Sequence, residues 1–245
     1  MKRITPLALC VFLVPALSVL SGCVVVNPLQ GGIVGKGDPE IYSVSVGEIN
    51  EIKGELFCNI QVFATPSDTI TLEIQPNLRE YVMVEESAGV LTVRTTRNII
   101  WSDNAPVLTV STSALNHLSL TGAGDFTAND PIIADSFTLD LAGAGTGKAE
   151  LDVRTLFVTM SGAGSYTLSG KAETADLRMD GAGKIDALAL QTQNAMVRLS
   201  GIGAIRIACS EALRIEAGGM GTVEYRGSPS VDLSRDGLVS VKKVD

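Results

Sequence analysis

One feature limits the fold of this chain more than any other: the triplet Gly-x-Gly recurs six times at nearly constant spacing. The first glycines of successive triplets are 21, 19, 19, 20 and 18 residues apart. Self-similarity at a period of this length is typical of repeat proteins, in which each repeat stacks on the next. The triplet glycines are Gly122, Gly124, Gly143, Gly145, Gly162, Gly164, Gly181, Gly183, Gly201, Gly203, Gly219 and Gly221.

Apolar side chains alternate with polar ones on both sides of each triplet. Alternation with period two predicts β-strands, and the glycines between the strands predict sharp corners. Each repeat is therefore predicted to form one coil of an all-β solenoid, with about 19–20 residues per coil. We expect the apolar middle residue of each triplet to point inward at its corner. The position four residues before the triplet holds Leu118, Leu139, Val158, Leu177, Val197 and Ile215.

The positions that face outward in this pattern are polar and keep phase from repeat to repeat. Stacked strands lie about 4.8 Å apart, so side chains in one column should touch. Charges of opposite sign follow one another in two such columns: Asp186, Arg206 and Glu224 in one, and Arg198 and Glu216 in the other. We expect these groups to form ion pairs between neighbouring coils.

The repeat divides the chain into regions. Residues 113–245 contain the regular repeats and a C-terminal cap, whose closing strands follow a turn at Pro229. Residues 41–112 are also β-like, but their period is looser, so they are interpreted as the less regular first part of the same structure. Together, residues 41–245 are predicted to form one domain.

The N-terminus has the form of a secretory signal. A basic start and an apolar stretch lead to Leu20-Ser21-Gly22-Cys23, which resembles the lipobox of bacterial lipoproteins. Residues 1–22 are therefore predicted to be removed, Cys23 to be lipidated and anchored to a membrane, and residues 23–40 to form a flexible tether. Val24 after the cysteine favours the outer membrane, although the sequence does not indicate the surface or the periplasmic face.

The net charge of the chain argues against nucleic acid as a partner. The chain has a net charge of −8, and removal of residues 1–22 leaves 17 basic and 27 acidic residues, a net charge of −10. An acidic domain without a basic cluster is a poor binding partner for nucleic acid.

Two cysteines, Cys58 and Cys209, remain after processing and lie on the apolar phase of their strands. Two buried free thiols are the favoured interpretation, and export permits a disulfide between them as the alternative.

With these residues in hand, the chain resembles the head GIN domain family, described as autotransporter adhesins. The likeness covers roughly residues 41–245 and is carried by three stretches: Ile52 through Leu72, the Gly-Ala-Gly series, and Gly219 through Val231. The resemblance implies a right-handed parallel β-helix on a secreted, often lipidated envelope protein. It brings no catalytic residues with it. The chain departs from the family pattern near Gly237, where a further Gly-x-Gly often occurs.

No pattern indicates a metal, a cofactor or a catalytic centre. His117 is the one histidine of the chain, and it is interpreted as an exposed polar residue. Gly-Ala-Gly-Asp at residues 122–125 is superficially like a calcium-binding β-roll, but later repeats have no acid in place of Asp125. A dinucleotide site would need a helix after the glycines. Trp101 could stack on a sugar, although a cover over the end of the core is favoured.

The sequence therefore predicts a non-enzymatic lipoprotein of the cell envelope that presents a rigid, acidic β-helix surface to a glycan or protein ligand. Two alternatives stay open. One is a passive structural or envelope-stress lipoprotein of the periplasm, and the other is a polysaccharide lyase or glycosidase. The enzyme would need two carboxylates at a defined separation. Candidate carboxylates on the outer faces are Asp140, Asp152, Asp176, Asp180 and Asp186.

Overall fold

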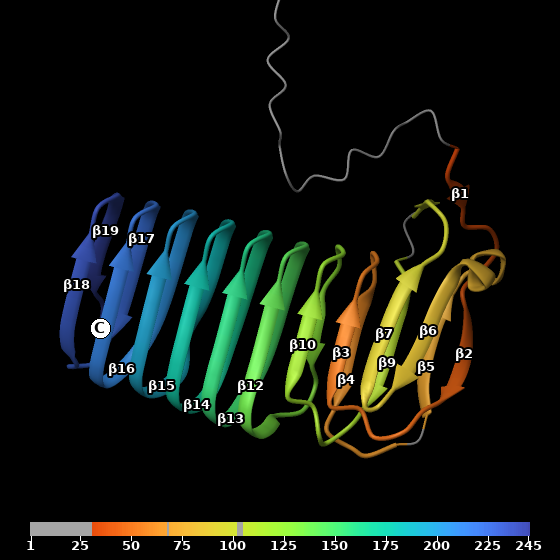
Figure 1. Cartoon of the computed structure of the whole chain (residues 1–245), viewed down its shortest axis with the longest axis horizontal. Coiled ribbons are helices and arrows are strands. Elements are labelled where there is room, and N and C mark those ends of the chain that lie inside the picture. The colour runs from red at the N-terminus through yellow and green to blue at the C-terminus, as the bar shows by residue number, and fades with distance from the viewer. Residues whose placement is uncertain (1–30, 68, 102–104) are drawn as a thin grey trace, which may run out of the picture. The chain divides into compact units, whose positions relative to one another are not determined.

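Stacked parallel strands dominate the computed structural model, which describes residues 31–67, 69–101 and 105–245. The strands form a β-solenoid of about seven turns, which confirms the predicted fold class. Figure 1 shows the coils side by side, from the C-terminal coil at β18 and β19 to the N-terminal strands β2 and β6. Within the described residues, no helix has both the length and the hydrophobicity that crossing a membrane requires.

Each regular coil has two faces. Face 1 follows the Gly-x-Gly corner and contains β4 (Asn59–Phe63), β11 (Phe126–Ala128), β17 (Met220–Arg226) and β19 (Leu238–Lys243). Face 2 precedes the next corner and contains β3 (Glu51–Gly54), β10 (His117–Leu120) and β18 (Ser230–Arg235). Long strands contribute to both faces where the chain bends between them. They are β12 (Ile132–Leu141), β13 (Ala144–Met160), β14 (Ala163–Met179), β15 (Ala182–Leu199) and β16 (Ile202–Ala217).

The core lies between the two faces and is built from the columns that the repeat predicts. The position four before each corner is almost inaccessible in all six coils. One column is interrupted, because Gly147 stands where its neighbours have large apolar residues. The ring of Tyr166, on the next coil, fills this space, since a Cβ at Gly147 would lie 2.4 Å from Tyr166 Cδ1. Close packing along the stack is thus kept despite the missing side chain.

The corner glycines are packed against the backbone of the preceding coil. A Cβ at Gly162 would lie 1.8 Å from the carbonyl oxygen of Gly143, and one at Gly181 would lie 1.9 Å from that of Gly162. The second glycine of a triplet often has a positive φ as well, for example 139° at Gly183. A side chain is therefore excluded by contact at the first glycine, and by both contact and conformation at the second.

The middle residue of each triplet does not point inward, so the sequence prediction for this position was wrong. Ile202 and Met220 are 57% and 46% exposed, and Ala144, Ala163 and Ala182 are exposed too. The physical reason is that the two glycines occupy the positions nearest the neighbouring coil. The residue between them is consequently left at the outer tip of the corner.

The N-terminal part ends the stack with antiparallel strands. On face 2, β6 (Val82–Ser87) pairs antiparallel with β7 (Val90–Thr95), and on face 1, β5 (Thr69–Ile74) joins β2 (Glu40–Ser45) to β9 (Val107–Ser111). The coil of β3 and β4 lies between these strands and β10 and β11, although it precedes most of them in sequence. A 3₁₀ helix, Pro76–Tyr81, connects β5 to β6.

Part of the predicted tether belongs to the folded unit. β1 (Ile33–Val34) pairs parallel with β8 (Ile99–Ile100), and the side chain of Asn77 donates a hydrogen bond of 2.9 Å to the carbonyl oxygen of Val34. The compact unit accordingly begins at residue 32. The apolar pair Ile33-Val34 explains the difference, since Ile33 packs against the core.

The predicted closing strands at the C-terminus form a complete last coil rather than a cover. Gly237 continues the corner column, because its Cβ would lie 2.2 Å from the carbonyl oxygen of Gly219. The inward-facing residues of this coil, Val231 and Leu233, remain exposed, as does Leu238. No further coil of the described chain stacks on them.

Candidate functional site

A large groove crosses six neighbouring coils of the described structure, half a coil away from the glycine corners. It lies at the bend between face 1 and face 2 and has a volume of about 1130 Å³. β12, β13, β14, β15 and β16 each contribute three consecutive residues to it, and the end of β17 closes the series. The groove therefore runs along the axis of the solenoid, perpendicular to the strands.

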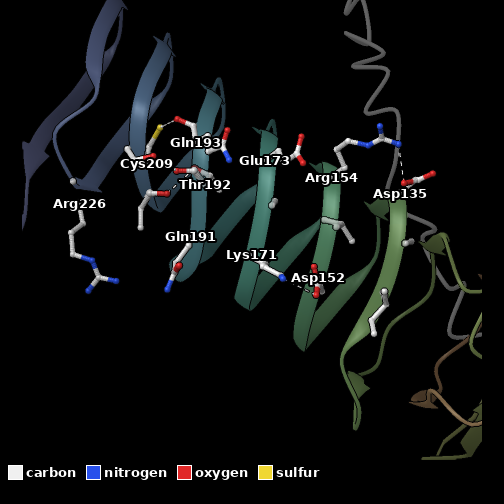
Figure 2. Close-up of a pocket in the computed structure, with 17 residues that line it drawn as sticks. Asp135, Asp152, Arg154, Lys171, Glu173, Gln191, Thr192, Gln193, Cys209 and Arg226 are labelled. Carbon is white, nitrogen blue, oxygen red and sulfur yellow. Dashed lines mark hydrogen bonds and ion pairs between the residues drawn. The ribbon is translucent and has the colours of Figure 1, made fainter.

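Two outward-facing columns form the sides of the groove, with an inward-facing column between them as its floor. This arrangement follows from strand geometry, because residues i and i+2 point to the same side and residue i+1 to the other. Figure 2 shows the labelled polar side chains in two rows. The first row contains Asp152, Lys171, Gln191 and Arg226, and the second contains Asp135, Arg154, Glu173 and Gln193.

Charged residues of the rows pair with one another along the stack. Arg154 Nη2 lies 2.8 Å from Asp135 Oδ1, and Lys171 Nζ lies 3.0 Å from Asp152 Oδ2. Each pair joins residues on adjacent coils within one row. Because these side chains are largely exposed, each pair adds little stability. Their main effect is to neutralise the charge of the rows.

Three side chains in the middle of the groove have no such partner. Among the residues that the structure describes, the side chains of Glu173, Gln191 and Gln193 make no hydrogen bond or ion pair. All three are exposed. They are the polar groups of the groove that a ligand can reach without first breaking a protein contact.

The floor is narrow and its polar atoms are already satisfied. Val153 and Ala172 are buried and supply its apolar part. Thr192 Oγ1 donates a 2.7 Å hydrogen bond to the carbonyl oxygen of Ala208. Cys209 Sγ lies 3.1 Å from the carbonyl oxygen of Gln193. A ligand would therefore meet alkyl groups at the bottom and polar groups only along the sides.

A step in the stack marks the C-terminal end of the groove. β15 has three more residues than β16 between two aligned positions, Ala187 and Gln191. The guanidinium of Arg226 reaches back over this step and donates a hydrogen bond to the carbonyl oxygen of Leu188. The coil of β16 is thus three residues shorter than that of β15 at this step, and Arg226 is held at the end of the first row.

A second, smaller hollow lies on face 2 and has a volume of about 460 Å³. Its lining is mainly apolar and includes Phe157 and Met196, of which Phe157 is 44% exposed. The column Phe157, Asp176, Met196 and Arg214 crosses it, so apolar and charged side chains alternate along the hollow.

The aspartates considered for an enzyme do not gather into a catalytic pair. Arg198 Nη1 lies 2.7 Å from Asp176 Oδ1, Arg178 Nε lies 2.6 Å from Asp180 Oδ2, and Arg206 Nη1 lies 2.9 Å from Asp186 Oδ2. Asp152 is paired with Lys171 in the groove. Each of these carboxylates thus faces a basic side chain of the protein rather than a second carboxylate.

His117 is half-buried between two carboxylates rather than freely exposed. Its Nδ1 lies 3.1 Å from Glu51 Oε1, and its Nε2 lies 3.1 Å from Asp140 Oδ2. The three residues Glu51, His117 and Asp140 come from three adjacent coils on face 2. Among the described residues, no group of three or more His, Cys, Asp or Glu side chains has the arrangement of a metal site.

The charge columns form the ion pairs that the sequence predicts. Arg206 bridges Asp186 at 2.9 Å and Glu224 at 2.8 Å, and Arg198 lies 3.5 Å from Glu216. Although partial burial raises the pKa of Asp186, hydrogen bonds from Lys184 and Arg206 outweigh it and hold that pKa below its ordinary value.

The structure separates the two cysteines. Cys58 and Cys209 are buried free thiols, and five coil spacings, about 24 Å, lie between their positions in the stack. A disulfide between them within one chain would need Cα atoms within about 7 Å, so the possible disulfide does not form, and the favoured interpretation, two buried free thiols, is confirmed. Burial raises the pKa of Cys58 to about 12. Cys23, the predicted lipid attachment site, lies outside the described residues.

Trp101 covers part of the core. It packs against the buried cluster, and its ring centroid lies 6.2 Å from that of Phe57. The groove itself was missed by the sequence analysis, which concentrated on the corners. A signal was present nonetheless: the polar positions midway between corners also recur with the period of the repeat, as Asp152, Lys171 and Gln191 show.

Comparison with known proteins identifies the type of domain. The family described as "Putative auto-transporter adhesin, head GIN domain" matches residues 50–229. A crystal structure described as a putative adhesin from Bacteroides fragilis has a TM-score of 0.82 and 23% sequence identity, and the match covers 87% of this chain and 100% of that one. No curated protein matches the chain.

Two further solved structures share the fold. One, described as a putative lipid binding protein from Parabacteroides distasonis, has a TM-score of 0.67 and 20% identity over 88% of this chain and 100% of that one. The other, described as a putative adhesin from Parabacteroides merdae, has a TM-score of 0.58 and 21% identity over 87% of this chain and 99% of that one. At these identities the likeness concerns the fold alone.

Proposed function

The chain belongs to the head GIN domain family, and on this basis we propose that it is a non-enzymatic binding module held in the bacterial cell envelope by a lipid on Cys23. The groove at the bend of the solenoid is its binding surface. Most of the chain, residues 32–245, forms one compact unit of stacked strands. Such a body presents its side chains at fixed intervals, which suits recognition of an extended partner.

The groove is the observation that carries this proposal. It combines a volume of about 1130 Å³ with polar groups from successive coils along both sides. Concave sites with a few convergent polar groups are where proteins usually hold ligands. Glu173, Gln191 and Gln193 are available for contacts there, whereas the charged residues elsewhere on the two faces are largely occupied by each other.

The state of the carboxylates supports a role in binding rather than in catalysis. Glycoside hydrolysis generally uses two carboxyl groups, one of which must be protonated to act as the acid. Asp152, Asp176, Asp180 and Asp186 each lie within 3.0 Å of a lysine or arginine side chain, so all four carboxylates are engaged in ion pairs. Asp140 contacts His117 instead. Among the described residues, these five aspartates therefore do not supply a pair of unengaged carboxylates for the enzyme alternative.

The lipid anchor rests on the sequence Leu20-Ser21-Gly22-Cys23 and on the family, whose name points to the cell surface. Labelling of cells with radioactive palmitate tests it directly. The chain should incorporate the label, and the Cys23→Ser variant should not. Persistent labelling of the variant would contradict the lipobox.

Protease treatment of intact and lysed cells tests the adhesin role. Digestion of the solenoid on intact cells places the groove outside, where it can meet a partner beyond the cell. Cells that carry the protein should then attach to a glycan- or protein-coated surface more strongly than cells that lack it. Protection until lysis would contradict adhesion and favour the alternative, a structural lipoprotein of the periplasm.

A further inference from the structure

We infer that the groove binds an extended, uncharged polysaccharide that lies along the solenoid axis, with about one sugar unit on each coil. This inference rests on the proposed function, because it names the class of ligand for the same groove. It is carried by three properties of the groove: the spacing of its polar rows, their net charge, and the chemistry of the side chains that are free to bind.

Spacing favours a sugar polymer over a peptide. Each row offers one side chain per coil, and stacked strands are about 4.8 Å apart. An extended peptide advances about 3.3 Å per residue, so its groups would fall out of register with the rows after a single coil. The units of an extended pyranose chain repeat at nearly the strand spacing. Successive sugars can therefore lie on successive coils along the groove.

Charge favours an uncharged polymer. The lining contains three acidic residues, Asp135, Asp152 and Glu173, and three basic residues, Arg154, Lys171 and Arg226, so its net charge is zero. The whole chain, in contrast, has a net charge of −8. Two of the acids and two of the bases already neutralise each other in pairs. Neither an anionic nor a cationic polymer would find an excess of opposite charge along the rows.

The free side chains match hydroxyl groups. Gln191 and Gln193 lie two residues apart on β15, one in each row, so their amides flank the groove at the same coil. Each amide has both a donor and an acceptor, as does each sugar hydroxyl. Glu173, one coil away, adds an acceptor. These groups can form hydrogen bonds to a neutral sugar without losing any contact within the protein.

The floor suits the other face of a sugar. Val153 and Ala172 present alkyl groups that can contact the C–H faces of the rings, and their small size leaves the groove open. No aromatic residue is present in the lining of this groove within the described structure, so no single sugar is held by stacking. Binding is expected to be weak per unit and to accumulate over the coils.

Calorimetric titration of the full-length chain, in micelles of a detergent without a sugar headgroup, tests the inference. The probes are neutral oligosaccharides of two to eight β-1,4-linked glucose, N-acetylglucosamine, xylose or mannose units. For at least one series the Kd should fall by about tenfold between two and six units and then level off, since six coils line the groove. High salt should leave the Kd nearly unchanged.

A double variant identifies the site. Gln191→Ala with Gln193→Ala should raise the Kd of the hexamer by about tenfold, because it removes two amides that bond to the ligand. Gln61→Ala is the matched control, since Gln61 is an exposed glutamine on face 1 outside the groove, and it should leave the Kd unchanged. Equal melting temperatures of the three proteins exclude an effect on folding.

Several outcomes would overturn the inference. One is a Kd that does not depend on oligomer length. Another is an equal loss of affinity for the hexamer in the double variant and in Gln61→Ala. A third is binding of anionic polygalacturonate alone, if high salt abolishes it. Absence of binding for every neutral series would do so as well. If cells that carry the protein still attach to protein-coated surfaces in that case, the inference fails and the proposed function stands. If attachment is also absent, the proposed function fails too.

Discussion

Two adjacent glycines in one corner should respond oppositely to the same substitution. Gly218 and Gly219 both lie in the turn between β16 and β17. A Cβ at Gly218 would have no heavy atom within 4 Å, whereas one at Gly219 would lie 2.1 Å from the carbonyl oxygen of Gly201. That oxygen accepts a 3.0 Å hydrogen bond from the backbone N–H of Met220. Gly219→Ala must therefore push two coils apart where they are bonded.

The magnitude follows from these contacts. Loss of the hydrogen bond costs about 1 kcal/mol, and forcing a methyl group into a packed site costs about 1–3 kcal/mol, so Gly219→Ala should destabilise by about 2–4 kcal/mol. At about 2–4 °C per kcal/mol for a domain of this size, Tm should fall by about 4–16 °C. Gly218→Ala should be neutral or stabilising by up to about 1 kcal/mol, because alanine restricts the unfolded chain.

Thermal unfolding followed by circular dichroism measures both variants against the parent chain. Gly181→Ala, in the middle of the stack, is a second test of the same contact, since its Cβ would lie 1.9 Å from the carbonyl oxygen of Gly162. Equal melting temperatures for Gly218→Ala and Gly219→Ala would refute the argument that close approach of the coils is what requires glycine at this position.

Three further predictions concern side chains. Arg206→Met should lower Tm, and the loss should shrink in high salt, because Arg206 bridges Asp186 and Glu224 at the surface. Asp186, whose pKa is held below its ordinary value, stabilises the fold above about pH 4, and this contribution is lost as the pH falls through the lowered pKa. The free energy of unfolding, measured by circular dichroism at neutral and at acidic pH, should therefore fall more in the parent than in Asp186→Asn, and equal falls would contradict this contribution. Cys58, with a pKa of about 12, should react with a thiol reagent at pH 8 only after denaturation, and rapid labelling of the native chain would contradict its burial.

The repeat determined most of the fold in advance, for a local reason. Alternation places Leu177 and Val197 on the inside of their strands, and the spacing of the glycines places them in register on adjacent coils. Both facts depend only on the period of the sequence. The ion pairs of Arg206 follow in the same way, because residues in equivalent positions of adjacent repeats must be neighbours.

The prediction that the side chains of Ile202 and Met220 point inward was wrong because it took the hydrophobicity of a corner residue as a sign that its side chain faces the core. In a strand, alternation decides which side chains face the core. At the Gly-x-Gly corner, the approach of the neighbouring backbone decides instead, and it leaves the apolar middle residue outside. The exposed state of Val231 and Leu233 has a related cause, since their pattern shows that they face the core but not whether another coil follows.

The sequence by itself determined that this chain is a stack of β coils with glycine corners, because a repeated pattern acts through near neighbours and each coil repeats the contacts of the last. Only the tertiary structure decided how the N-terminal strands reverse direction to end the stack, and where the bend hollows into a groove. It also decided that the coil of Cys58 lies five coils from that of Cys209. These features depend on the path of the backbone between the faces. That path is set by packing across the whole coil, including the close contacts of Tyr166 over Gly147 and the three-residue step after Ala187, which no local pattern encodes.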